Sequence, residues 1–183
     1  ILPMDPVLIQ DLRDEYERLS SDGFRVLAVA YKDMPTRETY SKDDENDLVL
    51  RGYVAFLDPP KESAGPAIAV LQKHGVTVKI LTGDNDLVSK KVCHDVGMST
   101  EHVVLGSHID AMSDGELLTA ARSATVFARL SPAHKKRIIE VLRANGHVVG
   151  FMGDGINDAP ALRAADVGIS VDTAVDIAKE SAD

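Results

Sequence analysis

After residue 61 the sequence alternates between short apolar segments and amphipathic segments, and short turns join them. Apolar runs of three to six residues between helical patterns are typical of βαβ units, whose parallel strands form a sheet with helices on both faces. We therefore predict an α/β fold with a doubly wound, Rossmann-type parallel sheet. The predicted strands are residues 76–81, 103–105, 125–128, 147–152 and 167–171, and the predicted helices are residues 62–74, 86–96, 114–122, 132–145 and 158–165, with a last helix near residue 179. Ser113, with Glu116 three residues on, and Ser131, followed by Pro132, are the predicted N-caps of the helices of residues 114–122 and 132–145.

The first 57 residues follow a different pattern, which predicts a small α+β unit. A helix is expected over residues 5–20 and strands over residues 24–31 and 48–57, with a polar loop between the strands. The run Asp58-Pro59-Pro60-Lys61 then interrupts the pattern. Each proline fixes φ and cannot donate to a sheet ladder, so this run predicts a stiff hinge. We place a domain boundary there, giving domains of residues 1–57 and 58–183.

Composition excludes several classes of function. The chain has 183 residues and a net charge of −9, which argues against a nucleic-acid-binding or anionic-membrane surface. Its single cysteine, Cys93, lies in an amphipathic segment and is expected to be a core thiol. The sequence has no apolar run near 18 residues, so this chain is not expected to span a membrane. The six histidines are scattered, which argues against a transition-metal site.

The most specific motif is the turn of residues 153–160, Gly-Asp-Gly-Ile-Asn-Asp-Ala-Pro, which follows a predicted strand. Open α/β sheets bind ligands at the carboxyl ends of their strands. Asp154 is therefore placed to ligate Mg²⁺, and Asn157 and Asp158 could orient phosphate, water or the shell around the metal. An alternative is that Asn157 and Asp158 only cap the next helix.

Two more strand ends carry polar residues. Thr82-Gly83-Asp84 follows the strand of residues 76–81, and a hydroxyl beside a helix N-terminus can hold a phosphate. The alternative is a plain turn with an N-cap. Lys135 lies in the first turn of the helix of residues 132–145, where a cation opposes the helix dipole unless an anion neutralises it. The alternative is a solvated lysine beside Lys136.

Together, the motifs at residues 58–61, 82–84, 132–135 and 153–160 resemble the phosphorylation domain of P-type ion-pumping ATPases, which are haloacid-dehalogenase-like hydrolases. The resemblance covers residues 58–183, and residues 1–57 resemble the last part of the family's nucleotide-binding domain. Among the subfamilies, the chain looks most like the bacterial magnesium-transporting pumps.

The resemblance implies a role for each matching residue, with Mg²⁺ and ATP as cofactors. Thr82 and Lys135 would hold the transferred phosphoryl group. Gly83 and Asp84 would shape the side of the site that faces the phosphate and the hinge. Asp154 would ligate Mg²⁺, with Asn157 and Asp158 supporting the phosphate, the metal and the lysine. Arg25 would reach the ATP phosphates. Asp58, Pro59 and Pro60 would form the hinge.

One departure from the family pattern is that the Asp-Lys-Thr-Gly-Thr motif, which carries the phosphorylated aspartate, does not occur in these 183 residues. That nucleophile is required for an aspartyl phosphate, and its strand lies centrally in the family's sheet. We therefore expect a fragment that lacks the acceptor and a core strand and is inactive alone. Its expected partners are the nucleophile strand, the actuator domain and the transmembrane helices of the pump, on the cytoplasmic side of the inner membrane.

Two alternatives stay open on the sequence. A soluble phosphatase of the same superfamily would need an Asp-x-Asp nucleophile, for which Asp33 and Asp58 lack the context. A non-catalytic nucleotide-binding module could use Arg25 and the acidic strand ends. Exposed strand edges could also support pairing between copies of the chain.

Overall fold

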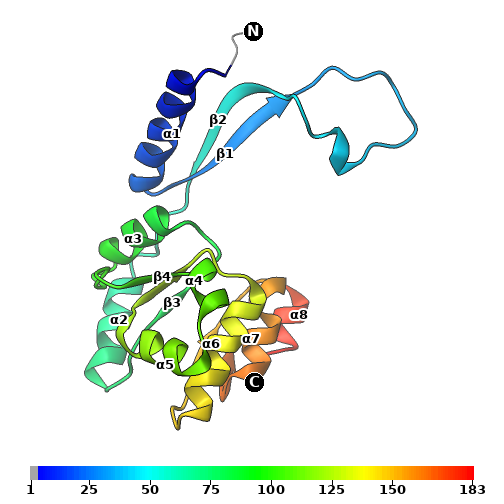
Figure 1. Ribbon diagram of the computed structural model, residues 1–183. Coiled ribbons are helices and arrows are strands. Elements are labelled where there is room, and N and C mark those ends of the chain that lie inside the picture. Colours follow the sequence, from blue (N-terminus) through cyan, green and yellow to red (C-terminus); the bar gives the residue numbers. More distant parts are fainter. Residues whose placement is uncertain (1–3) are drawn as a thin grey trace. The chain divides into compact units, whose positions relative to one another are not determined.

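The computed structural model describes residues 4–183, and the chain divides into two compact units, Ile1–Pro59 and Pro60–Asp183 (Figure 1). The division falls inside the run of residues 58–61 that contains two consecutive prolines. No helix of the described residues is both long enough and apolar enough to cross a membrane.

The first unit consists of one α-helix, a two-stranded antiparallel sheet and, between the strands, the short 3-10 helix η1 (Lys42–Asp44). Helix α1 (Pro6–Ser21) is followed by β1 (Phe24–Tyr31) and β2 (Val49–Leu57), close to the predicted bounds. Asp5 caps α1 by accepting a hydrogen bond from the backbone N–H of Leu8 at 2.8 Å. Helix and sheet are joined by the Tyr53 hydroxyl of β2, which donates to the Leu12 carbonyl of α1 at 3.1 Å.

The second unit contains the alternating elements. Its strands are β3 (Ile80–Leu81), β4 (Val103–Leu105), β5 (Val126–Ala128), β6 (Gly150–Met152) and β7 (Val167–Ile169). Its helices are α2 (Ala64–Lys73), α3 (Asp86–Asp95), α4 (Gly106–Ala111), α5 (Asp114–Ser123), α6 (Pro132–Ala144), α7 (Ala159–Ala164) and α8 (Asp176–Lys179), with the 3-10 helix η2 (Ile156–Asp158) before α7.

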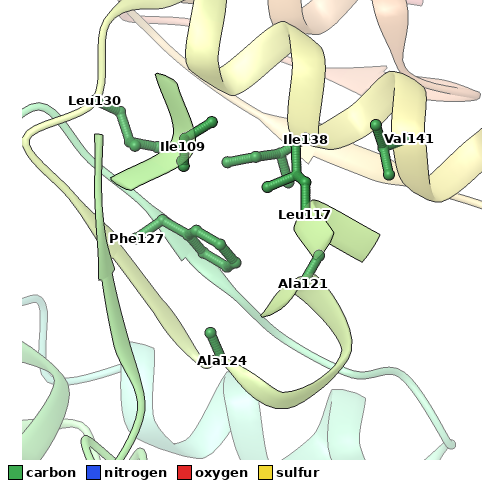
Figure 2. Packing of buried hydrophobic residues seen from close by; sticks show 8 residues of the cluster. All are labelled: Ile109, Leu117, Ala121, Ala124, Phe127, Leu130, Ile138 and Val141. Carbon is green, nitrogen blue, oxygen red and sulfur yellow. The ribbon is translucent and has the colours of Figure 1, made fainter. Parts of the chain in front are cut away.

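All strand pairs of this unit are parallel, but they form two separate sheets, β3-β5-β4 and β6-β7. Successive residues of β5 face opposite sides: Phe127 packs with residues of α4, α5 and α6 (Figure 2), and Val126 packs with Cys93 of α3. The predicted doubly wound α/β class is therefore confirmed. Cys93 is buried as predicted, and burial raises the pKa of its thiol.

One predicted strand was too long, because the segment of residues 76–81 pairs only at Ile80 and Leu81. The last predicted helix is present as the short helix α8. Helix α4 was not predicted, because six residues that begin with glycine carry too little periodicity to distinguish a helix from a turn. By contrast, Ser113 and Ser131 cap α5 and α6 as their spacing predicted.

The core packing gives a stability prediction. Leu117 of α5 is fully buried in the cluster around Phe127, whereas Leu71 of α2 is 45% exposed in the same unit. We expect Leu117→Ala to lower the free energy of unfolding of the second unit by about 2–5 kcal/mol, because it removes buried contacts and leaves a cavity. Leu71→Ala is the matched control and should cost less than about 1 kcal/mol. Equal losses in urea unfolding would contradict this placement of the core.

Candidate functional site

The three predicted motifs follow the carboxyl ends of three parallel strands. Thr82 follows β3, the turn into α6 follows β5, and the turn of residues 153–158 follows β6. These ends are where open α/β sheets bind their ligands. Hydrogen bonds join the three loops into one connected network.

Lys135 and Asp158 form the central contact of this network. The Lys135 Nζ donates to Asp158 Oδ1 at 2.7 Å, and the two side chains are only 13% and 12% exposed. Lys135 is therefore not a solvated lysine, which removes the alternative that the sequence left open. The pair joins the first turn of α6 to η2, 23 residues further along the chain.

The turn between β6 and η2 is shaped around the Asp158 carboxylate. The backbone N–H of Gly155 donates to Asp158 Oδ2 at 3.2 Å, so each carboxylate oxygen has one partner. A Cβ on Gly153 would lie 2.6 Å from the Cβ of Asp158, closer than real side chains approach. Glycine is needed at position 153 because the turn passes directly over Asp158.

Asp154 lies in this turn between Gly153 and Gly155, and it is exposed. Its backbone carbonyl accepts a hydrogen bond from Val175 N–H at 3.2 Å, and the neighbouring Gly153 N–H donates to the Ile169 carbonyl at 3.0 Å. No side-chain partner of Asp154 is found among residues 4–183. The backbone is thus fixed while the carboxylate stays open to an external ligand.

The loop after β3 is fixed against the loop after β5. The Leu130 N–H donates to the Thr82 carbonyl at 3.0 Å, and the Arg129 N–H donates to the Asp84 carbonyl at 2.8 Å. The Thr82 hydroxyl accepts from the Asp84 N–H at 3.1 Å and lies 3.2 Å from Asp84 Oδ2. Asn85, rather than Asp84, caps α3, so the simple-cap alternative for Asp84 is wrong.

Arg129 adopts a left-handed backbone conformation, with φ of 55°, at the end of β5. Such conformations are costly for side chains larger than glycine and concentrate at functional turns. Its guanidinium also pairs with Asp86 of α3 at 3.0 Å. Arg129 therefore connects the turn before α6 to the segment after Thr82 in two ways, through its backbone N–H and through its guanidinium.

The remaining predicted residues lie as follows. Gly83 is exposed in its loop, and Asn157 is exposed in η2, where its side chain forms no hydrogen bond with residues 4–183. In the first unit, Arg25 and Asp58 form an ion pair at 3.6 Å, and both side chains are more than half exposed. Such exposed pairs contribute little to stability.

The residues present supply only part of the ligands that Mg²⁺ needs, which is the usual way in which proteins bind this ion. Among residues 4–183, no three His, Cys, Asp or Glu side chains gather closely enough to hold a metal ion by themselves. Mg²⁺ is commonly bound through one or two carboxylates together with waters and substrate phosphates. The open carboxylate of Asp154 matches one such ligand, whereas the Asp158 carboxylate is already bonded to Lys135 and Gly155.

Comparison with known proteins agrees with the site. Residues 6–166 match the family model of the haloacid dehalogenase-like hydrolases, and the chain belongs to that family. It is 57% identical over its whole length to the magnesium-transporting ATPase, P-type 1, of Escherichia coli, and 56% identical to that of Salmonella typhimurium. A calcium-transporting ATPase of Listeria monocytogenes is 37% identical over 98% of the chain. The chain spans only about a fifth of the length of these relatives.

The close approach at Gly153 gives a prediction. Gly153→Ala should displace the Asp158 carboxylate, because the added methyl group would overlap its side chain. The change should appear as altered NMR signals of the Lys135 ammonium and the Gly155 amide.

Gly115→Ala on α5 is the matched control, since a Cβ there meets no atom within 4 Å. It should leave these signals unchanged. Unperturbed Lys135 and Gly155 signals in Gly153→Ala would contradict the close packing of the turn.

Proposed function

We propose that this chain is a cytoplasmic part of a P-type cation-transporting ATPase, in which it serves ATP-dependent phosphorylation of an aspartate and hydrolysis of the aspartyl phosphate. The observation that carries this proposal is the largely buried Lys135–Asp158 pair, joined through the strand-end loops to Thr82 and the open Asp154. Identity of 57% to magnesium-transporting pumps over the whole chain supports magnesium as the transported ion.

Each residue has a role that follows from its surroundings. The Lys135 ammonium, held at the strand ends by Asp158, supplies fixed positive charge for the transferred phosphoryl group. The Thr82 hydroxyl can turn from Asp84 to a phosphoryl oxygen, while Gly83 and Asp84 shape that side of the site. Asp154 would hold Mg²⁺, which polarises a phosphoryl oxygen and neutralises developing charge. Asn157, exposed beside this turn, is free to contact phosphate or the metal's waters.

The division of the sheet supports the proposal that the nucleophile lies on a strand from elsewhere in the longer protein. In the described residues β3 pairs only with β5, and β6 pairs only with β7. Leu81 of β3 nevertheless packs against the core clusters of both sheets. A strand inserted between β3 and β6 would unite them and carry its carboxyl end beside Thr82 and Asp154.

The exposure of the β6 segment supports the same proposal. Val148 is 87% exposed and Met152 is 66% exposed, although strands of parallel sheets are normally covered on both faces. We propose that other segments of the pump cover these side chains, and that the remaining partners are its actuator domain and transmembrane helices at the inner membrane.

The first unit is proposed to be the last part of the nucleotide-binding domain. Arg25 lies on the exposed side of β1, opposite Phe56 of β2, and is proposed to reach the ATP phosphates. Asp58, Pro59 and Pro60 are proposed to form the hinge between this domain and the phosphorylation domain, because the two prolines restrict backbone rotation.

The absence of the nucleophile motif predicts that the 183-residue chain does not label itself. Incubation with Mg²⁺ and γ-³²P-ATP should give no acid-stable phosphoprotein, because no aspartate in the chain occupies the acceptor position. The longer protein that contains this sequence, labelled in parallel, is the positive control. Stoichiometric labelling of the 183-residue chain would contradict the proposal that the acceptor aspartate lies outside these residues.

The metal role predicts the effect of a single substitution in the longer protein. Asp154→Ala should reduce the phosphoenzyme level below detection, since the carboxylate that holds Mg²⁺ is lost. Glu140→Ala, in the middle of α6 and exposed, is the control for a lost negative charge and should label as the wild type does. An unchanged phosphoenzyme level in Asp154→Ala would argue against this assignment.

A further inference from the structure

His134, the residue before Lys135, forms hydrogen bonds through both ring nitrogens. Nδ1 lies 3.1 Å from the backbone N of Ser131, and Nε2 lies 2.8 Å from Asp110 Oδ1 on α4. The imidazole is only 16% exposed. The sequence drew attention to Lys135 but gave no role to His134 or Asp110.

The bonding fixes the tautomer of this histidine. A backbone N–H can only donate, so Nδ1 must be the unprotonated acceptor and Nε2 must carry the proton. The Nε2–H then donates to the Asp110 carboxylate. Rotating the ring by half a turn would place carbon atoms where the two nitrogens lie, so both the Ser131 N–H and the Asp110 carboxylate would lose their partner in the ring. The orientation is therefore determined by both partners.

The helix cap at Ser131 is unusual because of this histidine. Ser131 is the N-cap of α6, and His134 occupies the position that Glu or Gln takes in ordinary capping boxes. Glutamate could accept from the Ser131 N–H equally well, but it could not donate to Asp110. Histidine therefore adds a connection to α4 that the cap alone does not need.

The backbone is shaped to admit this contact. A Cβ on Gly106, the first residue of α4, would lie 2.4 Å from the Arg129 carbonyl and 2.8 Å from His134 Nδ1. One turn further along α6, Arg137 donates to the Ile109 carbonyl at 2.9 Å and the Met112 carbonyl at 2.6 Å. Residues three apart share a helix face, so His134 and Arg137 hold α6 against α4 from the same side.

We propose that His134 is a positioning residue, which fixes the first turn of α6 and thereby the ammonium of Lys135 by bonding at once to Ser131 and to Asp110. Lys135 is the next residue along the same turn, and its Nζ contacts Asp158 of η2. Movement of this turn would carry Lys135 away from the position that phosphoryl transfer requires. The proposal rests on the proposed function only for its catalytic consequence, since the positioning itself is a property of this chain.

The positioning is tested directly on the 183-residue chain by NMR of the histidine ring nitrogens and of the backbone amides. The wild type should show His134 as a single Nε2–H tautomer, with slow hydrogen exchange at the Ser131 amide. Asp110→Ala should give a mixture of tautomers, faster exchange and shifted Lys135 ammonium signals. Asp110→Asn retains an acceptor oxygen and should behave as the wild type.

Two further variants separate the cap from the connection to α4. His134→Gln can still accept from the Ser131 N–H, so the cap amide should remain protected while the Lys135 signals shift as in Asp110→Ala. His108→Ala changes an exposed residue of the same helix α4, and it should alter neither the protection of the Ser131 amide nor the Lys135 signals. Wild-type Lys135 signals in both Asp110→Ala and His134→Gln would overturn the proposal.

The catalytic consequence is measured in the longer protein. Asp110→Ala should slow phosphorylation at saturating ATP about tenfold with the KM for ATP nearly unchanged, and Asp110→Asn should restore the rate. A rate equal to the wild type would overturn the link between His134 and catalysis. Failure of the wild-type longer protein to form a phosphoenzyme would instead contradict the proposed function, while the NMR result on the chain would still decide the positioning.

Discussion

The ion pair between Lys135 and Asp158 is the contact on which the arrangement of the site depends. Helix α6 packs on the β3-β5-β4 sheet, whereas η2 and α7 belong with β6 and β7, and no strand pairing in the described residues joins the two sheets. The two groups are held together by the packing of α6 against α7, by Leu81, which packs against both core clusters, and by this pair of largely buried charges. Removing one partner would leave the other charge buried and uncompensated, which costs far more than the loss of an exposed pair.

The surrounding backbone makes this contact possible at the end of three strands. Gly153 lets the turn pass directly over Asp158, and the Gly155 N–H satisfies the second carboxylate oxygen. On the other side, the left-handed turn at Arg129 directs the chain from β5 into α6 and bonds to the loop after Thr82. The result is a fixed cation, Lys135, bonded to the turn that also carries the open carboxylate of Asp154. A fixed cation and a carboxylate for Mg²⁺ are groups that phosphoryl transfer uses.

The sequence predicted the features that depend on local pattern and short spacing. The α/β class, the caps at Ser113 and Ser131, and the buried Cys93 follow from periodicity and capping chemistry, and the structure confirms them. It did not predict α4 or the contact between His134 and Asp110, because that contact joins residues 24 positions apart. It also overestimated the strand of residues 76–81, since apolar composition does not show which backbone groups find a partner. The catalytic roles of Thr82, Lys135 and Asp154 stay predictions.

The most direct test is a crystal structure of the longer protein with Mg²⁺ and beryllium fluoride, a mimic of the phosphoryl group. The account predicts a strand paired with both β3 and β6, its aspartate bearing the beryllium fluoride. Lys135 Nζ and the Thr82 hydroxyl should lie within hydrogen-bonding distance of the fluorides, and Asp154 should ligate the metal. Direct pairing of β3 with β6, or an anion bound away from Lys135 and Thr82, would contradict it.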